Sequence, residues 1–313
     1  SDANRFIAFD NESYIEPLIE GEILLNNQNL KEDIFLNNQN VTEPVDYIII
    51  ARSDMIFQAE RLAQINRDNN NLNVQVVDVQ HIYNEFSSGN QDISAIRNFV
   101  RYVYSNQSNE NALKYICLFG DASFDYKDRI ASNTNIIPSW YSLNSFSLSS
   151  SYVSDDFFGM MDFNEGLMSS SNKLDIAVGR ILADSNDRAV DLVDKIESYY
   201  SQDSFDDWRN KLIVISDDVD EPWENIIQST SNNIADLISE NKPFFNTKKI
   251  LSDAYNQETS SGGERYPEVK NQIINGMKQG ALVINYFGHG GEDGIARERI
   301  FDKIDASEVI NEN

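Results

Sequence analysis

The chain alternates apolar runs with segments of helical periodicity, and this alternation constrains its fold more than any other feature. The first strand-like runs occupy 45–51, 73–79 and 114–119. Ser53 or Asp54 can cap a helix that continues to about residue 68. Between the second and third runs, residues 93–104 place their apolar side chains at the spacing of one helical face. Strands that alternate with helices predict a parallel sheet with right-handed crossovers.

A second series follows a long polar stretch that runs from 120 to about 173 and is rich in Ser, Asn and Asp. A loop of this length in a compact domain is usually functional or mobile. After it, strand-like runs lie at 174–178, 211–215, 247–251 and 281–287, and helical segments lie at 186–200, 221–240, 267–279 and 300–310. We therefore expect an α/β chain with a first subdomain at 44–205 and a second at 206–313. Residues 1–43 read as a lead-in segment or the tail of a preceding domain.

Composition excludes several classes of function. Twenty-five Lys and Arg residues against 51 Asp and Glu residues give a net charge of −26, which argues against binding to nucleic acid or to an anionic membrane surface. No apolar run reaches the length of a membrane span, and residues 1–11 contain no signal-peptide core. The single cysteine, Cys117, excludes an internal disulfide and a cysteine-based zinc site.

The stretch Ala281–Gly294 carries the strongest functional signal. Its apolar run ends at His289, which is flanked by glycines, so we expect this histidine at the carboxyl end of a buried strand. Open α/β sheets bind their ligands at that edge. The alternative is a polar residue in an ordinary glycine turn. Phosphate binding by the glycines is disfavoured because Glu292 and Asp293 would repel an anion, and the other histidine, His81, is read as structural.

An acidic loop at 216–220 follows the neighbouring strand-like run. In a parallel sheet this loop and the glycine-histidine loop project from the same edge, so a carboxylate could orient the imidazole of a catalytic base. The chain offers no obvious nucleophile to complete such a site. Cys117 lies inside an apolar run, where small buried cysteines are usually inert.

Several blocks of sequence occur in the order and rough spacing found in one enzyme family. They are Gly120-Asp121, the Ser154–Gly159 block, Val178-Gly179-Arg180, Glu224–Ile227 and the Asn285–Gly290 block. Over residues 44–313 the chain resembles the gingipain-type cysteine peptidases, and the His-Gly block is the most specific motif. Residues 124–141 and 153–159, with the leading segment, look most similar to the PorU-type sortases of the type IX secretion system.

The resemblance implies a caspase-like fold with two side-by-side subdomains and assigns roles to individual residues. His289 matches the catalytic histidine, and Gly290 matches the glycine whose N–H helps to bind the oxyanion. Asp218 falls where the family has a glutamate that orients the histidine, although its side chain is one methylene shorter. Asp220 falls where arginine-specific members hold the basic side chain of the substrate.

The resemblance also implies that the chain is a piece of a longer protein. The nucleophilic cysteine of the family follows the next strand after the histidine, whereas this chain ends 24 residues after His289. We therefore expect an incomplete second subdomain and no peptidase activity from residues 1–313, and the absence of an initiating methionine agrees with an excised piece.

No cofactor is expected to be required. The family often binds calcium, and Asp121, Ser123 and Asp125 place oxygen ligands at alternate positions, although the loop lacks the glycine and glutamate of an EF-hand and could be a solvated acidic loop.

The resemblance implies protein or peptide substrates, other type IX secretion components as partners, and a location at the cell surface or outer membrane. The rival interpretation is a caspase-like surface module that binds or scaffolds without catalysis.

Overall fold

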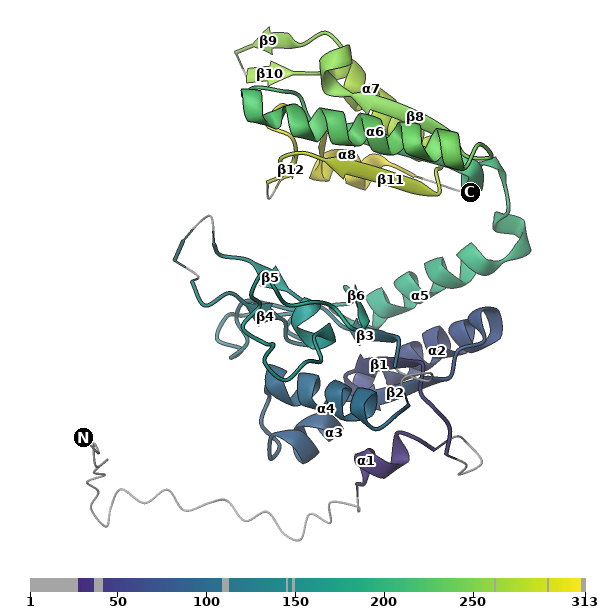
Figure 1. The fold of residues 1–313 in the computed structure, drawn as a ribbon, viewed down its shortest axis with the longest axis vertical. Helices are drawn as coiled ribbons and strands as arrows, with labels where there is room; N and C mark the ends of the chain where they lie inside the picture. The colour runs from purple at the N-terminus through teal and green to yellow at the C-terminus, as the bar shows by residue number, and fades with distance from the viewer. Residues whose placement is uncertain are drawn as a thin grey trace, which may run out of the picture. The chain divides into compact units, whose positions relative to one another are not determined.

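The computed structural model describes residues 28–36, 42–108, 113–144, 146–147, 150–261, 263–291 and 293–310. Residues 1–27 and 37–41 of the predicted lead-in segment lie outside this range. The chain divides into two compact units between Glu197 and Ser198, whereas the sequence prediction placed the boundary between 205 and 206. Each unit contains its own parallel sheet (Figure 1).

The first unit is built around a four-stranded parallel sheet. Its elements are α1 (Leu30–Asp33), β1 (Tyr47–Ala51), α2 (Ile56–Asn70), β2 (Val74–Asp78), α3 (Val79–Phe86), α4 (Ile93–Ser105), β3 (Tyr115–Phe119), β4 (Trp140–Tyr141), β5 (Val153–Ser154), β6 (Ala177–Ile181) and α5 (Asn186–Tyr200). The strand order is β2-β1-β3-β6. The chain moves from β1 to β2 and then back across β1 to β3, so right-handed crossovers place α2 and α4 on opposite faces of the sheet. Both faces are covered, and β1 is consequently buried along Ile48–Ala51.

Arg180 on β6 fastens the long loop between β3 and β6 to the end of this sheet. Its guanidinium donates to both carboxylate oxygens of Asp155, at 2.7 and 2.8 Å. It also donates to the carbonyl oxygens of Gly120 and Ile137, each at 2.7 Å. The side chain is only 9% exposed, so one buried cation organises several turns of the loop.

The second unit is built around a three-stranded parallel sheet. Its elements are β7 (Lys211–Ser216), α6 (Asn225–Asn241), β8 (Asn246–Leu251), β9 (Glu258–Ser260), β10 (Gly263–Arg265), α7 (Pro267–Gln279), β11 (Val283–Phe287), β12 (Gly294–Ile295), β13 (Phe301–Asp302) and α8 (Lys303–Glu308). The strand order is β11-β7-β8, with β7 in the centre. The crossovers through α6 and α7 run in opposite directions and therefore cover opposite faces.

The two sheets flanked by helices agree with the predicted caspase-like α/β class, but some local predictions were wrong. Ser53 and Asp54 do not cap α2, because both lie in a 3₁₀ turn that precedes it. The last strand of the first unit begins at Ala177 rather than near residue 174. His81 lies within α3, a helix that the sequence analysis did not predict and that begins where Asp78 accepts a hydrogen bond from the Gln80 N–H.

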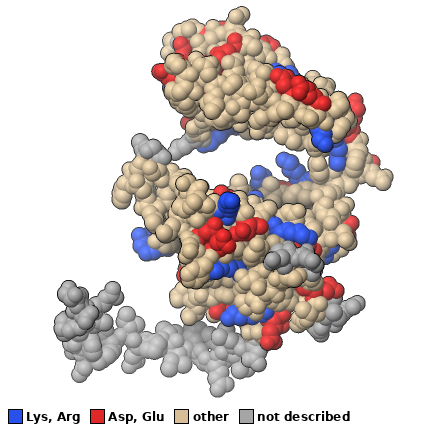
Figure 2. Space-filling view, viewed as in Figure 1, with Lys and Arg blue, Asp and Glu red and all other residues tan. Residues whose placement is uncertain are grey.

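On the face drawn in Figure 2, acidic and basic side chains are interspersed on both units. In the part of the chain that the structure describes, no helix is long and apolar enough to span a membrane.

Candidate active site

His289 and an acidic loop meet at the carboxyl edge of the sheet in the second unit. Strands β7 and β11 are parallel neighbours, and Phe287 lies opposite Ser216 in their register. The next residues of both strands therefore enter the same space above the sheet edge, as the sequence analysis expected. The Asp217 N–H donates to the carbonyl of Phe287 at 3.2 Å, which continues the pairing one step past the strand end.

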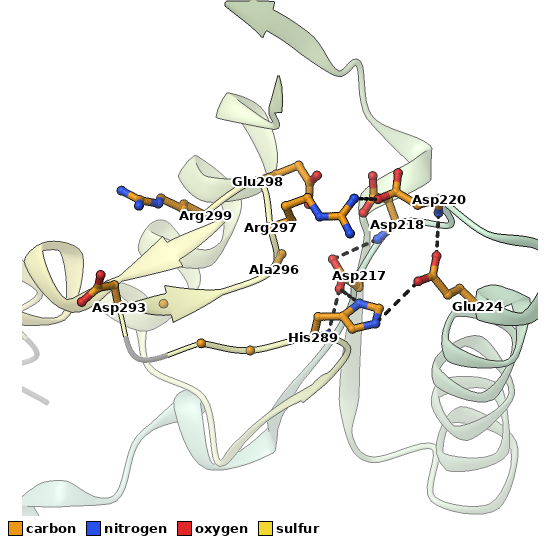
Figure 3. Close-up of a pocket in the computed structure, with 13 residues that line it drawn as sticks. Asp217, Asp218, Asp220, Glu224, His289, Asp293, Ala296, Arg297, Glu298 and Arg299 are labelled. Carbon is orange, nitrogen blue, oxygen red and sulfur yellow. Dashed lines mark hydrogen bonds and ion pairs between the residues drawn. The ribbon is translucent and has the colours of Figure 1, made fainter. Parts of the chain in front are cut away.

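The imidazole of His289 lies between two carboxylates (Figure 3). Asp217 Oδ2 is 2.9 Å from Nδ1 and also accepts the backbone N–H of His289 at 2.8 Å. Glu224 Oε1 is 3.5 Å from Nε2. The side chains of Asp217 and Glu224 are 3% and 7% exposed, whereas that of His289 is 51% exposed. The ring is thus supported from the protein side and open to solvent.

Glu224 also organises the segment that precedes α6. Its Oε2 accepts the backbone N–H groups of Asp220 and Glu221, at 2.8 and 2.7 Å. Glu221 accepts in return from the Glu224 N–H, which completes a capping box. The adjacent Trp223 presents its ring edge-on to His289, with 6.0 Å between ring centroids. The Glu224 side chain therefore contacts the acidic loop, the start of the helix and the imidazole.

Asp218 does not make the histidine contact that the resemblance implied. Its carboxylate accepts from the Tyr266 hydroxyl at 3.1 Å and from the Gln257 amide at 3.4 Å, and burial raises its pKa above the usual range. The contact with His289 comes from Asp217, one residue earlier. Asp217 is held there by its two hydrogen bonds to His289, whereas Asp218 is held by Tyr266 and Gln257.

Gly290 lies opposite Ile295 in an antiparallel bridge. The bonds of this bridge come from the flanking residues, since the Gly291 N–H donates to Gly294 and the Ala296 N–H donates to His289, at 2.9 and 2.8 Å. In a pair of this kind the bridged residues direct their own N–H groups away from each other. The N–H of Gly290 is therefore directed away from Ile295, and this residue lines the pocket.

A pocket of about 370 Å³ opens beside His289. The charged side chains that line it are Asp217, Asp218, Asp220, Glu224, Asp293, Arg297, Glu298 and Arg299. Asp220 contributes from the acidic loop, and its carboxylate accepts from the Arg297 guanidinium at 2.8 Å. Carboxylates outnumber guanidinium groups in this lining, so the pocket is negative overall and favours a cationic ligand.

The family is decided by a comparison with known sequences. The model of peptidase family C25 matches residues 40–313. The chain belongs to peptidase family C25. This is the gingipain family of cysteine peptidases, so the resemblance inferred from the motifs is confirmed.

Other comparisons add less to this assignment. A search of curated proteins gave no match. Among solved structures, the chain is similar to the crystal structure of dimeric latent PorU from Porphyromonas gingivalis, with 28% identity and a TM-score of 0.43. The match covers 51% of this chain and 16% of that chain.

In this C25 chain, Cys117 lies in the first unit, on the central part of β3. It is 4% exposed, and burial raises the pKa of its thiol to about 11. A cysteine peptidase needs a thiolate that a base can reach. Cys117 therefore has the properties of a core residue, as its apolar surroundings in the sequence suggested.

The predicted calcium loop uses its acidic side chains for internal hydrogen bonds. Asp121 accepts from the Ala122 N–H and from the Thr134 hydroxyl, both at 2.8 Å. Asp125 accepts from the backbone N–H groups at 129 and 130. Ser123 accepts from the Asp125 N–H at 3.1 Å. Calcium at Asp121, Ser123 and Asp125 remains a prediction.

Sequence reasoning missed Asp217, Glu224, Arg297 and Glu298 as members of the site. Asp217 was within the acidic loop that we expected at the sheet edge, but the pattern of the loop does not reveal which aspartate faces the histidine. Arg297 and Glu298 lie beyond the glycine motif, on a turn whose return to the pocket depends on the β12–β13 pairing. Strands of two residues have no recognisable sequence pattern, so the sequence does not predict that this turn lies beside the pocket.

Proposed function

We propose that the chain carries the base and the substrate-binding part of a cysteine endopeptidase site. The supporting observation is the 2.9 Å contact between Asp217 Oδ2 and His289 Nδ1, with the opposite nitrogen of the ring near the pocket lining. An ionised carboxylate only accepts hydrogen bonds, so the nitrogen that faces Asp217 carries the proton. Nε2, which has Glu224 Oε1 at 3.5 Å, would accept the proton of a thiol.

Proton transfer would leave an imidazolium with a carboxylate near each nitrogen. Asp217 at Nδ1 and Glu224 at Nε2 both attract this cation, and both are largely removed from solvent. Charges fixed in this way need little reorganisation when the proton moves. The thiolate would attack the peptide carbonyl, and His289 would later return the proton to the leaving amine.

Gly290 would bind the oxyanion that forms during the attack. Its N–H is directed away from Ile295, and the bridge hydrogen bonds on both sides fix its peptide plane. A preformed backbone donor of this kind is commonly worth about 10²- to 10³-fold in kcat.

Asp220 would hold a basic substrate side chain next to the scissile bond. Arg297 already occupies this carboxylate with its own guanidinium, and the Arg297 side chain is 80% exposed. A substrate Lys or Arg would therefore displace a solvent-exposed cationic side chain of this chain. The exposed pair gains little stability, so the exchange costs little.

The nucleophile would be a cysteine that is not within residues 1–313. The sequence resemblance places it after a further strand, and the burial of Cys117 supports a nucleophile elsewhere. The motifs at 124–141 and 153–159 support a sortase role in type IX secretion, with cleavage of C-terminal sorting domains from cargo. Such a protein would act at the cell surface or outer membrane beside other secretion components.

The test uses a fluorogenic basic peptide and the protein extended through the next strand and its cysteine. We expect turnover that a cysteine-directed inhibitor blocks, and no turnover from residues 1–313. Asp217→Asn should lower kcat by about 10³- to 10⁴-fold because it disturbs the tautomer, and Asp218→Asn should have at least a tenfold smaller effect. Equal losses would refute the assignment of Asp217. An extended protein with no inhibitor-sensitive activity would refute the peptidase proposal.

Specificity is tested separately from catalysis. Asp220→Asn should lower kcat/KM for basic substrates, by an amount that corresponds to a loss of about 2–4 kcal/mol of transition-state stabilisation. The kcat/KM for neutral substrates should not change. Equal losses for basic and neutral substrates would show that Asp220 supports the loop rather than the substrate.

A further inference from the structure

Three buried carboxylates converge in the lining of the pocket. Asp217 and Asp218 come from the loop after β7, and Glu298 comes from the turn between β12 and β13. One oxygen from each lies within 4.8 Å of the others. The three residues are 2%, 6% and 2% exposed. In Figure 3, Glu298 reaches from its turn toward the loop that carries the two aspartates.

The described residues supply little positive charge to this cluster. Of the three, only Asp217 has an ion-pair partner among the described residues, namely His289. Arg297, which is adjacent to Glu298 in sequence, pairs instead with Asp220. Like charges in a buried space repel one another, and each also loses its hydration. Some further positive charge or proton must therefore compensate them.

Glu298 provides the second observation. Its Oε1 is buried and has no hydrogen-bond partner among the described residues. Buried carboxylate oxygens without a donor are rare in folded proteins and usually indicate an ion or another polar partner.

We propose that Asp217, Asp218 and Glu298 bind one calcium ion. Calcium takes oxygen ligands at about 2.3–2.6 Å, so two ligands of one ion can be separated by up to about 5 Å, which the observed spacing satisfies. The donors are all carboxylate oxygens, and this favours a hard cation over zinc or copper. Calcium also tolerates irregular geometry, whereas magnesium demands a near-octahedral site.

The ion would tie two walls of the pocket together. It would join the loop after β7 to the turn that holds Arg297 and Glu298. Asp217 would bind the ion with one oxygen while Oδ2 keeps its bonds to His289. The ion is therefore a positioning element for the imidazole, distinct from the predicted loop at Asp121 to Asp125. This inference rests on the carboxylate geometry and does not depend on the peptidase function.

The test measures calcium binding by residues 1–313 after treatment with a chelator. Calorimetric titration should show one calcium site in the wild-type protein. The Glu298→Gln variant should bind calcium at least tenfold more weakly. Calcium should raise the Tm of the wild type and leave that of Glu298→Gln unchanged. Without calcium, Glu298→Gln should be at least as stable as wild type, because it removes a buried charge. That result would also show that the variant folds.

Matched variants separate this site from its surroundings. Asp293→Asn removes an exposed carboxylate from the same pocket and should retain the full calcium response. Asp125→Asn should also retain it, because that residue belongs to the other candidate loop. Absence of binding at millimolar calcium, a full response in Glu298→Gln, or loss of the response in Asp125→Asn would each overturn the proposal. A magnesium response equal to the calcium response would overturn the choice of ion.

Discussion

The reactivity of Cys117 tests where the chemistry of this protein lies, because it is the only cysteine in the chain. It pairs with Ile49 on one side and Gly179 on the other, inside the four-stranded sheet. Burial raises the pKa of its thiol from an ordinary 9.0 to about 11. The perturbation is a small thiol reagent applied to the native protein, and the measurement is the rate of labelling by mass spectrometry.

The reagent can label Cys117 by two routes, directly in the native state or after transient opening of the protein. In the native state, a shift from 9.0 to about 11 lowers the thiolate fraction about a hundredfold at pH values below 9, and the surrounding strands block the reagent as well. In the second route the protein opens transiently and exposes the thiol, which then reacts at its ordinary rate, but only a small fraction of the molecules is open at any time. If opening costs about 5 kcal/mol, that population is on the order of 10⁻⁴. Native labelling at pH 8 should therefore be at least about a hundredfold slower than labelling in urea.

The pH dependence of the labelling rate distinguishes direct reaction of the native protein from reaction after opening. The thiol in the unfolded chain loses its proton at lower pH than the folded one, so the rate in urea, and the rate of any labelling through opening, should level off near pH 9. Direct labelling of the native protein should keep rising toward pH 11. A Cys117→Ala variant supplies the blank. Native labelling within about tenfold of the unfolded rate, or inhibitor-sensitive turnover that requires Cys117, would refute the assignment of this residue to the core.

Two further substitutions test the scaffold and the site. Arg180→Met leaves Asp155 and several carbonyl oxygens without their donor, so it should lower the free energy of unfolding of the first unit by about 3–5 kcal/mol. Arg180→Lys should cost about 1–3 kcal/mol because it keeps the charge but loses the planar fork. Urea unfolding followed by tryptophan fluorescence reports on this unit when Trp208 and Trp223 of the second unit are replaced by Phe in all the proteins compared, so that only Trp140 emits. A loss below about 1 kcal/mol for Arg180→Met would contradict the argument. Gly288→Ala would place a Cβ 2.3 Å from the Tyr286 hydroxyl and 2.5 Å from the Asp217 Cβ, so it should destabilise the second unit by about 1–3 kcal/mol. Gly291→Ala, which has no heavy atom within 4 Å of the added Cβ, should stay within about 0.5 kcal/mol of wild type, and equal effects of the two would show that the close approach at Gly288 does not matter.

The sequence was sufficient to predict the parallel sheets and the meeting of the two candidate loops at one sheet edge, because both depend on patterns that extend over many residues. Apolar runs at 45–51, 114–119 and 211–215 correspond to the buried strands β1, β3 and β7. Parallel pairing then brings the loops after β7 and β11 to one edge, whatever the details of their side chains. The strand β12 has two residues, too few for a pattern, and α3 was missed because its first residue, Val79, continues the apolar run of the preceding strand.

The identity of the carboxylate at His289 could not be predicted for a different reason. Asp217 and Asp218 are chemically identical neighbours, and the choice between them depends on which way the chain turns after Ser216. That turn is fixed by the Phe287 carbonyl, by Tyr266 and by Gln257, all of which are distant in sequence. The resemblance to the family pointed to the right loop and to the wrong aspartate within it.

The double contact of Asp217 Oδ2 with His289 bears on how a glycine-rich loop can hold a base in one orientation. Glycines at 288, 290 and 291 leave the backbone many accessible conformations, and each of them lowers the fraction of time that the ring spends in one orientation. A single oxygen that accepts from both the backbone N–H and Nδ1 couples the torsions of the main chain to those of the side chain. Rotation of the ring by half a turn would replace Nδ1 with a carbon and break that coupling. The orientation of the imidazole therefore depends on one carboxylate oxygen of the neighbouring strand end rather than on the conformational preferences of the glycines around it.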